Sequence, residues 1–205
     1  VGEDRPGLNG TLEIRELGPS QSATVSGFWP GPTGVLSIEL RDNLGTVTLQ
    51  GIEMVYGSSE IERSVAIESC DAVLLVDVRT DGGWHPAFPT RGLDVIASNV
   101  HLFDCRIEGG DGYVDLLDGL EVGLPGGPGI VIDGGVLTAQ GSHVEGGPGA
   151  FVGPSPFGCE GLIGGTGGNG IEIDGGATVQ LVDTDLIAGP AGEVVSAGTC
   201  TEGIP

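Results

Sequence analysis

The stretch Gly129-Ile-Val-Ile-Asp-Gly-Gly135 recurs 41 residues later as Gly170-Ile-Glu-Ile-Asp-Gly-Gly176. Each copy continues into a second short run of alternating apolar residues, Leu137-Thr-Ala139 in the first and Val179-Gln-Leu181 in the second. Side chains alternate between the two faces of a strand, so each run predicts a strand with one buried face. A repeated unit of strand, glycine turn, strand and Gly/Pro-rich loop is typical of a solenoid whose units stack on one another.

The same template can be followed toward the N-terminus, giving about six coils that are clearest over residues 34–189. Matching positions in the first strand of each coil are separated by 24, 29, 28, 37 and 41 residues. The extra residues of the longer, later repeats all fall in the third part of the coil, after the second strand. We therefore expect long Gly-rich loops on one side. Residues 1–205 are interpreted as one domain, either a whole solenoid or a segment of a longer one. The matching first-strand residues are Ile14, Ile38, Ile67, Val95, Ile132 and Ile173.

These repeats resemble the right-handed parallel β-helix proteins of the pectate-lyase-like superfold, especially secreted bacterial repeat proteins. The motif that carries the resemblance is Gly-Ile-x-Ile-x-Gly-Gly…Val-x-Leu…Leu, together with Ser98-Asn-Val-His-Leu-Phe-Asp-Cys-Arg-Ile-Glu-Gly109. The resemblance implies an all-β, right-handed parallel β-helix. It implies no single function, because the fold hosts lyases, hydrolases, epimerases, adhesins and inert scaffolds. Such proteins commonly begin with an amphipathic capping helix, a pattern that residues 1–10 do not show, so we expect an open end.

The composition excludes some classes of binding partner but says little about activity. The net charge is −22, and all seven basic residues are arginine. Nucleic acids and anionic membranes need a basic face, so neither is an expected partner. No run of 18 apolar residues is present, so membrane insertion is not expected either. The acidic surface favours a soluble protein that contacts cations or cationic partners.

The four cysteines predict one disulfide. Cys159 and Cys200 follow the equivalent positions Gly146 and Ala188 at nearly the same distance, which places them in neighbouring loops. We therefore predict a Cys159–Cys200 bridge, with two free thiols as the alternative. Such a bridge indicates an oxidising setting, outside the cell or at its surface. Cys70 and Cys105 are placed at opposite ends of the second strand, too far apart to bond, and are interpreted as small buried residues at strand corners.

Stacked carboxylates are the candidate metal ligands. The template places Asp77 and Asp104 on successive coils, close enough to share a proton or bind a cation. Asp111 and Asp115 lie in a segment that is similar to calcium-binding Gly-Gly-x-Gly-x-Asp repeats but departs from their spacing. No cofactor is required by the sequence, and loosely bound calcium is the one candidate. The alternative is that an aspartate at a strand-ending turn simply recurs for structural reasons.

Candidate carbohydrate contacts are Trp84, His85 and Phe88, which form the one aromatic cluster; the alternative is a loop that packs over the coil. No catalytic residues are assigned. Without lysine, a lyase-type base would have to be Arg79, Arg91 or Arg106, and the three histidines fall in different template columns. The sequence leans away from an enzyme without deciding the question.

Two hypotheses follow. The first is a non-catalytic extracellular structural or cell-surface protein whose open coils stack end to end with other copies. The second is a protein that binds or degrades polysaccharide.

Overall fold

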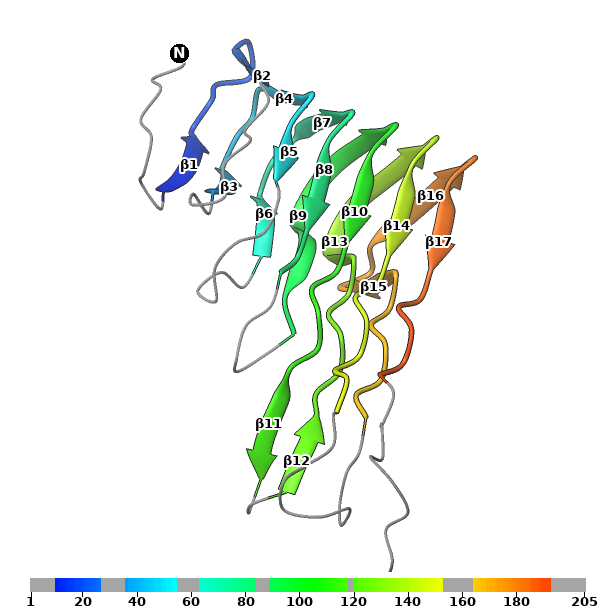
Figure 1. Cartoon of the computed structure of the whole chain (residues 1–205). Helices are drawn as coiled ribbons and strands as arrows, with labels where there is room; N and C mark the ends of the chain where they lie inside the picture. Colours follow the sequence, from blue (N-terminus) through cyan, green and yellow to red (C-terminus); the bar gives the residue numbers. More distant parts are fainter. Residues whose placement is uncertain are drawn as a thin grey trace, which may run out of the picture.

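The structure is a computed structural model of the 205-residue chain, and it describes residues 10–26, 36–54, 63–83, 89–117, 120–152 and 164–192. Every regular element in these ranges is a β-strand. Almost all strands pair in parallel with the equivalent strand of the next repeat, as Figure 1 shows. The strands fall into three rows, and we call the consecutive strands that contribute once to each row a layer.

The first two rows form one large curled parallel sheet. Strands β9 (Arg91–Phe103) and β13 (Ile130–Gln140) run through both rows without a break. The first row also contains β1 (Gly10–Arg15), β3 (Leu36–Arg41), β6 (Arg63–Glu68) and β15 (Ile171–Asp174). The second row also contains β2 (Ser22–Ser26), β4 (Thr46–Gln50), β7 (Ala72–Val76) and β16 (Thr178–Val182).

The third row is a separate parallel sheet of short strands, in the order β17-β14-β10-β8-β5. These strands are β5 (Glu53–Met54), β8 (Arg79–Asp81), β10 (Arg106–Glu108), β14 (His143–Glu145) and β17 (Asp185–Ile187). The architecture is all-β with a large parallel sheet, which is compatible with a parallel β-solenoid. Among the described residues, no helix is long and apolar enough to cross a membrane.

The observed register confirms the repeat alignment except at its start. Val95 pairs with Ile132, and Ile132 with Ile173, as the template predicts. Ile14, however, pairs with Leu40 rather than Ile38, so the first two separations are 26 and 27 residues instead of 24 and 29. A slip of two residues leaves the same side chains facing inward, so apolar alternation cannot detect it. The buried core consists of these inward columns of Ile, Leu and Val.

Both corners of the curled sheet contain a column of residues in the left-handed backbone region. The corner between the first and second rows carries Asp42, Ser69 and Ala97 with φ of 53°, 53° and 46°, followed by Gly134 and Gly175. These residues lie one on the next, and backbone N–H groups link the layers there, from Asp42 to the Glu68 carbonyl and from Ser69 to the Ile96 carbonyl, both at 3.0 Å. Aspartate and glycine recur at the corners because they tolerate this conformation.

The Gly-rich segments are an ordered, hydrogen-bonded slab rather than irregular loops. Gly127 donates to the Gly110 carbonyl at 2.7 Å, Gly147 to Gly127 at 2.8 Å, and Gly168 to Gly147 at 2.8 Å. Each link joins a segment that leaves the sheets to one that returns, and these segments run side by side below the third row in Figure 1. A Cβ atom on Gly127 would overlap the Thr90 carbonyl oxygen, so only glycine fits there.

Glycines in the slab recur three residues apart, as at Gly126/Gly129 and Gly146/Gly149. A Cβ atom on any of these four would come within 3.0 Å of a backbone oxygen of a neighbouring segment, so a side chain has no room there. Beyond the slab lies an antiparallel hairpin that the sequence did not predict, formed by β11 (Val114–Leu117) and β12 (Leu120–Gly123). The side chains of Leu116, Leu117, Leu120 and Glu121 are not described.

Candidate functional site

The predicted carboxylate pair does stack, at the corner between the second and third rows. Val76 pairs with Phe103, so Asp77 lies directly over Asp104, and the Asp77 N–H donates to the Phe103 carbonyl at 3.0 Å. Both residues have left-handed φ, 50° and 52°. Gly51, Gly141 and Asp183 occupy the same column with φ of 60°, 62° and 47°. Backbone conformation therefore accounts for the recurrence of aspartate there, and calcium binding stays a prediction.

The remaining acidic candidates lie elsewhere. Asp111 is close to Asp81 and Glu108, two carboxylates of the third row that the sequence did not single out. Burial raises the pKa of both Asp81 and Asp111, and the negative charge of Glu108 raises each further. The Gly83 N–H donates to Asp81 at 3.1 Å and partly opposes that shift. Within the described residues, no group of three or more His, Cys, Asp or Glu side chains is arranged to hold a metal.

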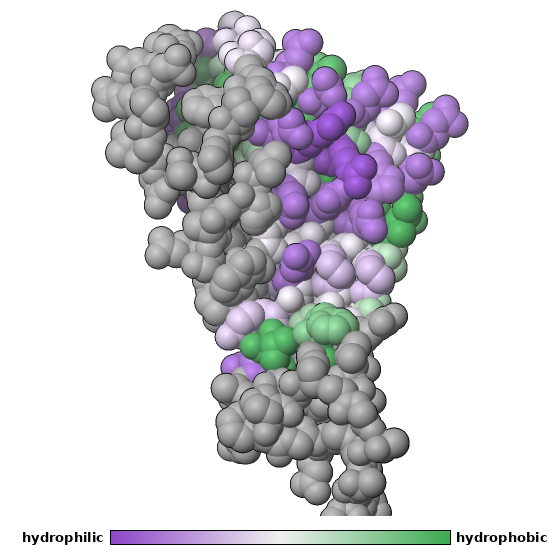
Figure 2. Space-filling view, in the orientation of Figure 1, coloured by the Kyte–Doolittle hydropathy of each residue, from purple (hydrophilic) through white to green (hydrophobic). Residues whose placement is uncertain are grey.

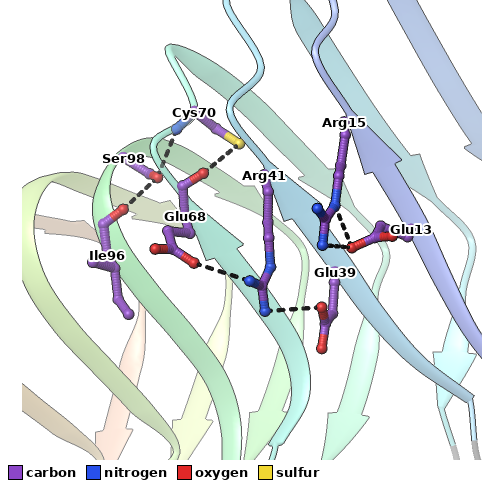
Figure 3. Close-up of polar contacts among 8 residues, drawn as sticks. All are labelled: Glu13, Arg15, Glu39, Arg41, Glu68, Cys70, Ile96 and Ser98. Atoms are coloured by element: carbon purple, nitrogen blue, oxygen red, sulfur yellow. Dashed lines mark hydrogen bonds and ion pairs between the residues drawn. The ribbon is translucent and has the colours of Figure 1, made fainter.

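The buried cysteines behave as predicted for strand corners. Cys70 and Cys105 are free and 2% exposed. Each sits directly after a left-handed residue and hydrogen-bonds to a carbonyl two residues earlier, Cys70 Sγ to Glu68 at 3.3 Å (Figure 3). Burial raises the pKa of the Cys105 thiol, so it is a poor nucleophile. Cys159 and Cys200 of the predicted disulfide lie outside the described residues, as do Trp84, His85 and Phe88.

The candidate lyase-type bases are all engaged with carboxylates. Arg106 pairs with Glu108, and Arg79 approaches Glu53 at 4.0 Å. Arg91 Nη1 donates to Asp94 Oδ2 at 3.1 Å. Each guanidinium whose side chain the structure describes has such a partner; the other two of these are Arg15 with Glu13, and Arg41 with Glu39 and Glu68.

The two histidines that the structure describes lie in different rows, and the third, His85, lies outside the described residues. In the second row, His101 Nδ1 lies 2.6 Å from Thr138 Oγ1. In the third row, His143 Nε2 lies 3.1 Å from Glu145. They do not converge on one site.

A groove lies where the returning slab segments meet the first row. Its volume is about 560 Å³. The Arg91–Asp94 pair forms part of the wall, with Asp94 only 2% exposed. A second polar pair, from Asn169 Nδ2 to Glu172 Oε1 at 3.1 Å, lies on the same wall. Three proline rings, Thr166 and slab glycines also line the groove; the prolines are Pro89, Pro125 and Pro128.

The last layer presents the most unusual surface among the described residues. Ile173, Leu181 and Leu186 are 55%, 39% and 49% exposed, although they occupy inward columns. Their register partners one layer earlier, Ile132, Ala139 and Val144, are at most 2% exposed. Strands β15, β16 and β17 each pair on one side only within the described part of the chain.

Figure 2 shows the outer face of the third row as largely hydrophilic, with apolar residues at the margin beside β17. Apolar alternation alone could not single out these exposed residues, since a buried strand shows the same pattern.

The chain matches no protein-family model, and neither the curated proteins nor the solved structures compared with it gave a match.

Proposed function

We propose that the chain is a right-handed parallel β-helix of about six coils that serves as a non-catalytic, extracellular structural or cell-surface protein. Its copies assemble end to end through the open last coil. The acidic, lysine-free composition and the expected Cys159–Cys200 bridge support a location outside the cell.

The supporting observation is that the last layer exposes three apolar side chains, Ile173, Leu181 and Leu186. Removing apolar surface from water is favourable by roughly 25 cal/mol per Å². The edges of β15, β16 and β17 also offer backbone N–H and C=O groups to another strand. One further layer would bury these apolar side chains and pair the backbone groups of the open edge. A stacked copy of the chain would provide such a layer.

The test is the particle mass of the chain across a concentration series, measured by multi-angle light scattering with electron micrographs of the same samples. We expect rods with masses that are multiples of 20.6 kDa. Leu181→Lys should shorten them, because it places a charge on the apolar face. Leu44→Lys is the control, since Leu44 is also an exposed leucine, at 55% against 39% for Leu181, but lies in the segment between β3 and β4. A monomer at every concentration would overturn the proposal.

Polysaccharide binding is the second candidate, and the groove beside Arg91 favours it. Proline rings offer apolar faces, while the Arg91–Asp94 and Asn169–Glu172 pairs offer donors and acceptors for hydroxyl groups. Pro89 in the wall directly follows the Trp84–Phe88 stretch in sequence. Calorimetric titration with neutral and acidic oligosaccharides tests it. Binding should weaken in Glu172→Gln and persist in Glu145→Gln, whereas no heat with any oligosaccharide would reject this candidate.

A further inference from the structure

We infer that the copies stack head to tail, with the last layer of one copy covered by the first layer of the next in the register of the repeat itself. This inference rests on the proposed end-to-end assembly and names its partner surface, the edges of β1 and β2 that pair with no other strand in the described part of the chain. In that register, Leu12 and Ile14 of the second copy lie over Ile171 and Ile173 of the first. Ala23 and Val25 lie likewise over Val179 and Leu181.

The inward columns show that this register continues the existing core. Each inward column of the first and second rows is aliphatic from the first layer to the last, and at the first layer Leu12, Ile14 and Val25 are only partly buried. A second copy would therefore extend each column by a residue of the same kind. Two of the columns are Ile14–Leu40–Ile67–Val95–Ile132–Ile173 and Val25–Leu49–Leu75–Leu102–Ala139–Leu181.

Charge distinguishes head-to-tail stacking from the symmetric alternative. The last layer carries four exposed carboxylates, on Glu172, Asp174, Asp183 and Asp185. A tail-to-tail dimer would set this group against a copy of itself, and like charges across an interface are unfavourable. A head-to-head dimer would leave Ile173 and its neighbours exposed. Head-to-tail stacking covers Ile173 and sets the acidic group against a layer that contains Arg15 as well as Glu13 and Glu16, so the carboxylates meet a cation and not only like charges.

The head-to-tail register also creates a specific ion pair. It places Arg15 of the second copy beside Asp174 of the first, in the column that contains Arg41 and Glu68. Within the chain, Arg41 Nη1 lies 3.7 Å from Glu68 Oε2 on the neighbouring strand, and Figure 3 shows Arg15 and Arg41 extending along the same face. The Arg41–Glu68 contact is thus an internal example of the contact that Arg15 and Asp174 would make between copies.

The backbone corner continues as well. In the corner column, the backbone N–H of Glu16 donates to the Arg41 carbonyl at 3.3 Å, and the backbone N–H of Asp42 donates to the Glu68 carbonyl at 3.0 Å. The equivalent hydrogen bond from the backbone N–H of Gly175 would reach the Arg15 carbonyl of the second copy. Because the same patch never meets itself, the interface is heterologous, and repeating it gives an open filament rather than a closed dimer.

A cysteine pair tests direction and register together. The register sets Thr24 of one copy opposite Gln180 of the other, and both side chains are exposed. Neighbouring parallel strands are about 4.8 Å apart, within the Cα separation that a disulfide accepts. The double variant Thr24→Cys/Gln180→Cys is made in a Cys159→Ser/Cys200→Ser background, which leaves only the buried Cys70 and Cys105. Oxidation should give a reducible ladder of multiples of 20.6 kDa.

The controls separate this inference from the proposed assembly. Thr24→Cys/Glu172→Cys places the second thiol in the other row and should give no ladder. Gln180→Cys alone should stay monomeric on the gel, because tail-to-tail contact is its only route to a dimer. Rods in micrographs together with a Gln180→Cys dimer, or with no ladder from the double variant, would overturn the head-to-tail register but leave assembly standing. Absence of rods in the background variant and in the unaltered chain would remove both.

Discussion

The backbone N–H of Cys70 donates to Ser98 Oγ on the next layer at 2.9 Å, and the Ser98 hydroxyl donates to the carbonyl of Ile96, two residues before it on the same strand, at 2.7 Å. Figure 3 shows this relay at the corner between the first and second rows. The opposite corner repeats it, with the Cys105 N–H donating to Ser142 Oγ at 3.1 Å and Ser142 Oγ to the Gln140 carbonyl at 3.1 Å. At each of these two corners a buried serine that follows a left-handed residue thus joins one layer to the next.

Replacing Ser98 with Ala should destabilise the protein by about 1–3 kcal/mol, because it leaves the buried Cys70 N–H without its acceptor. Thermal and urea unfolding followed by circular dichroism measure the change. Thr184→Ala is the matched control: Thr184 Oγ1 makes the same bond to the Val182 carbonyl, but in the half-exposed last layer. Equal losses in the two variants would contradict the role given to burial.

The slab makes a prediction about glycine. Gly127→Ala should cost roughly 1–3 kcal/mol or more, because the added methyl group overlaps the Thr90 backbone and packed segments must separate. Gly18→Ala should change stability little, since its nearest neighbour is the flexible Gln21 side chain at 3.4 Å. Neither glycine has a positive φ, so space alone distinguishes them. Hydrogen exchange across residues 109–129 in Gly127→Ala would show whether the loss is local; unchanged protection there would refute the packed slab.

At the Asp column, backbone conformation and metal binding predict different results for one substitution. Asp104→Gly should leave stability nearly unchanged, because glycine accepts φ of 52° freely. Asp104→Val should lose about 1–2 kcal/mol, the usual cost of a left-handed conformation for other residues. Gln50→Val, at an exposed strand position, is the control for valine itself. Melting curves with calcium and with chelator complete the test. A calcium-dependent gain that Asp104→Gly abolishes would favour the metal site.

The raised pKa of Asp111 predicts how stability changes with acidity. A carboxyl group whose pKa is higher in the folded state favours folding below its ordinary value of 3.8, and that contribution is lost as the pH rises through the folded pKa. Asp111→Asn should therefore melt above the unaltered protein at neutral pH, with the difference closing below pH 3.8. The control is Asp185→Asn, whose side chain is 82% exposed. A neutral-pH melting point that falls in Asp111→Asn would refute the prediction.

Sequence periodicity predicted the strand rows, the corner aspartates and the buried cysteines, because each depends on local alternation and on counting along the repeat. The same alternation could not fix the pairing of Ile14, since Ile38 and Leu40 face the same way. The slab was predicted as loops, because its order comes from backbone bonds such as Gly147 to Gly127, between segments distant in sequence. The exposure of Leu181 could not be predicted from the sequence either, since its strand has the same apolar alternation as a buried strand.

One matched pair of residues tests the open end directly. Ile132 and Ile173 are aligned in adjacent layers, yet their exposures are 0% and 55%. Ile132→Ala should cost about 2–5 kcal/mol at any protein concentration, as in other cores. In dilute protein Ile173→Ala should cost much less, because the side chain has little packing to lose. At high concentration, stacking buries it, and its cost should approach that of Ile132→Ala. Unfolding measured over a wide concentration range distinguishes the cases: a cost for Ile173→Ala that never changes with concentration would mean that this face stays open to solvent.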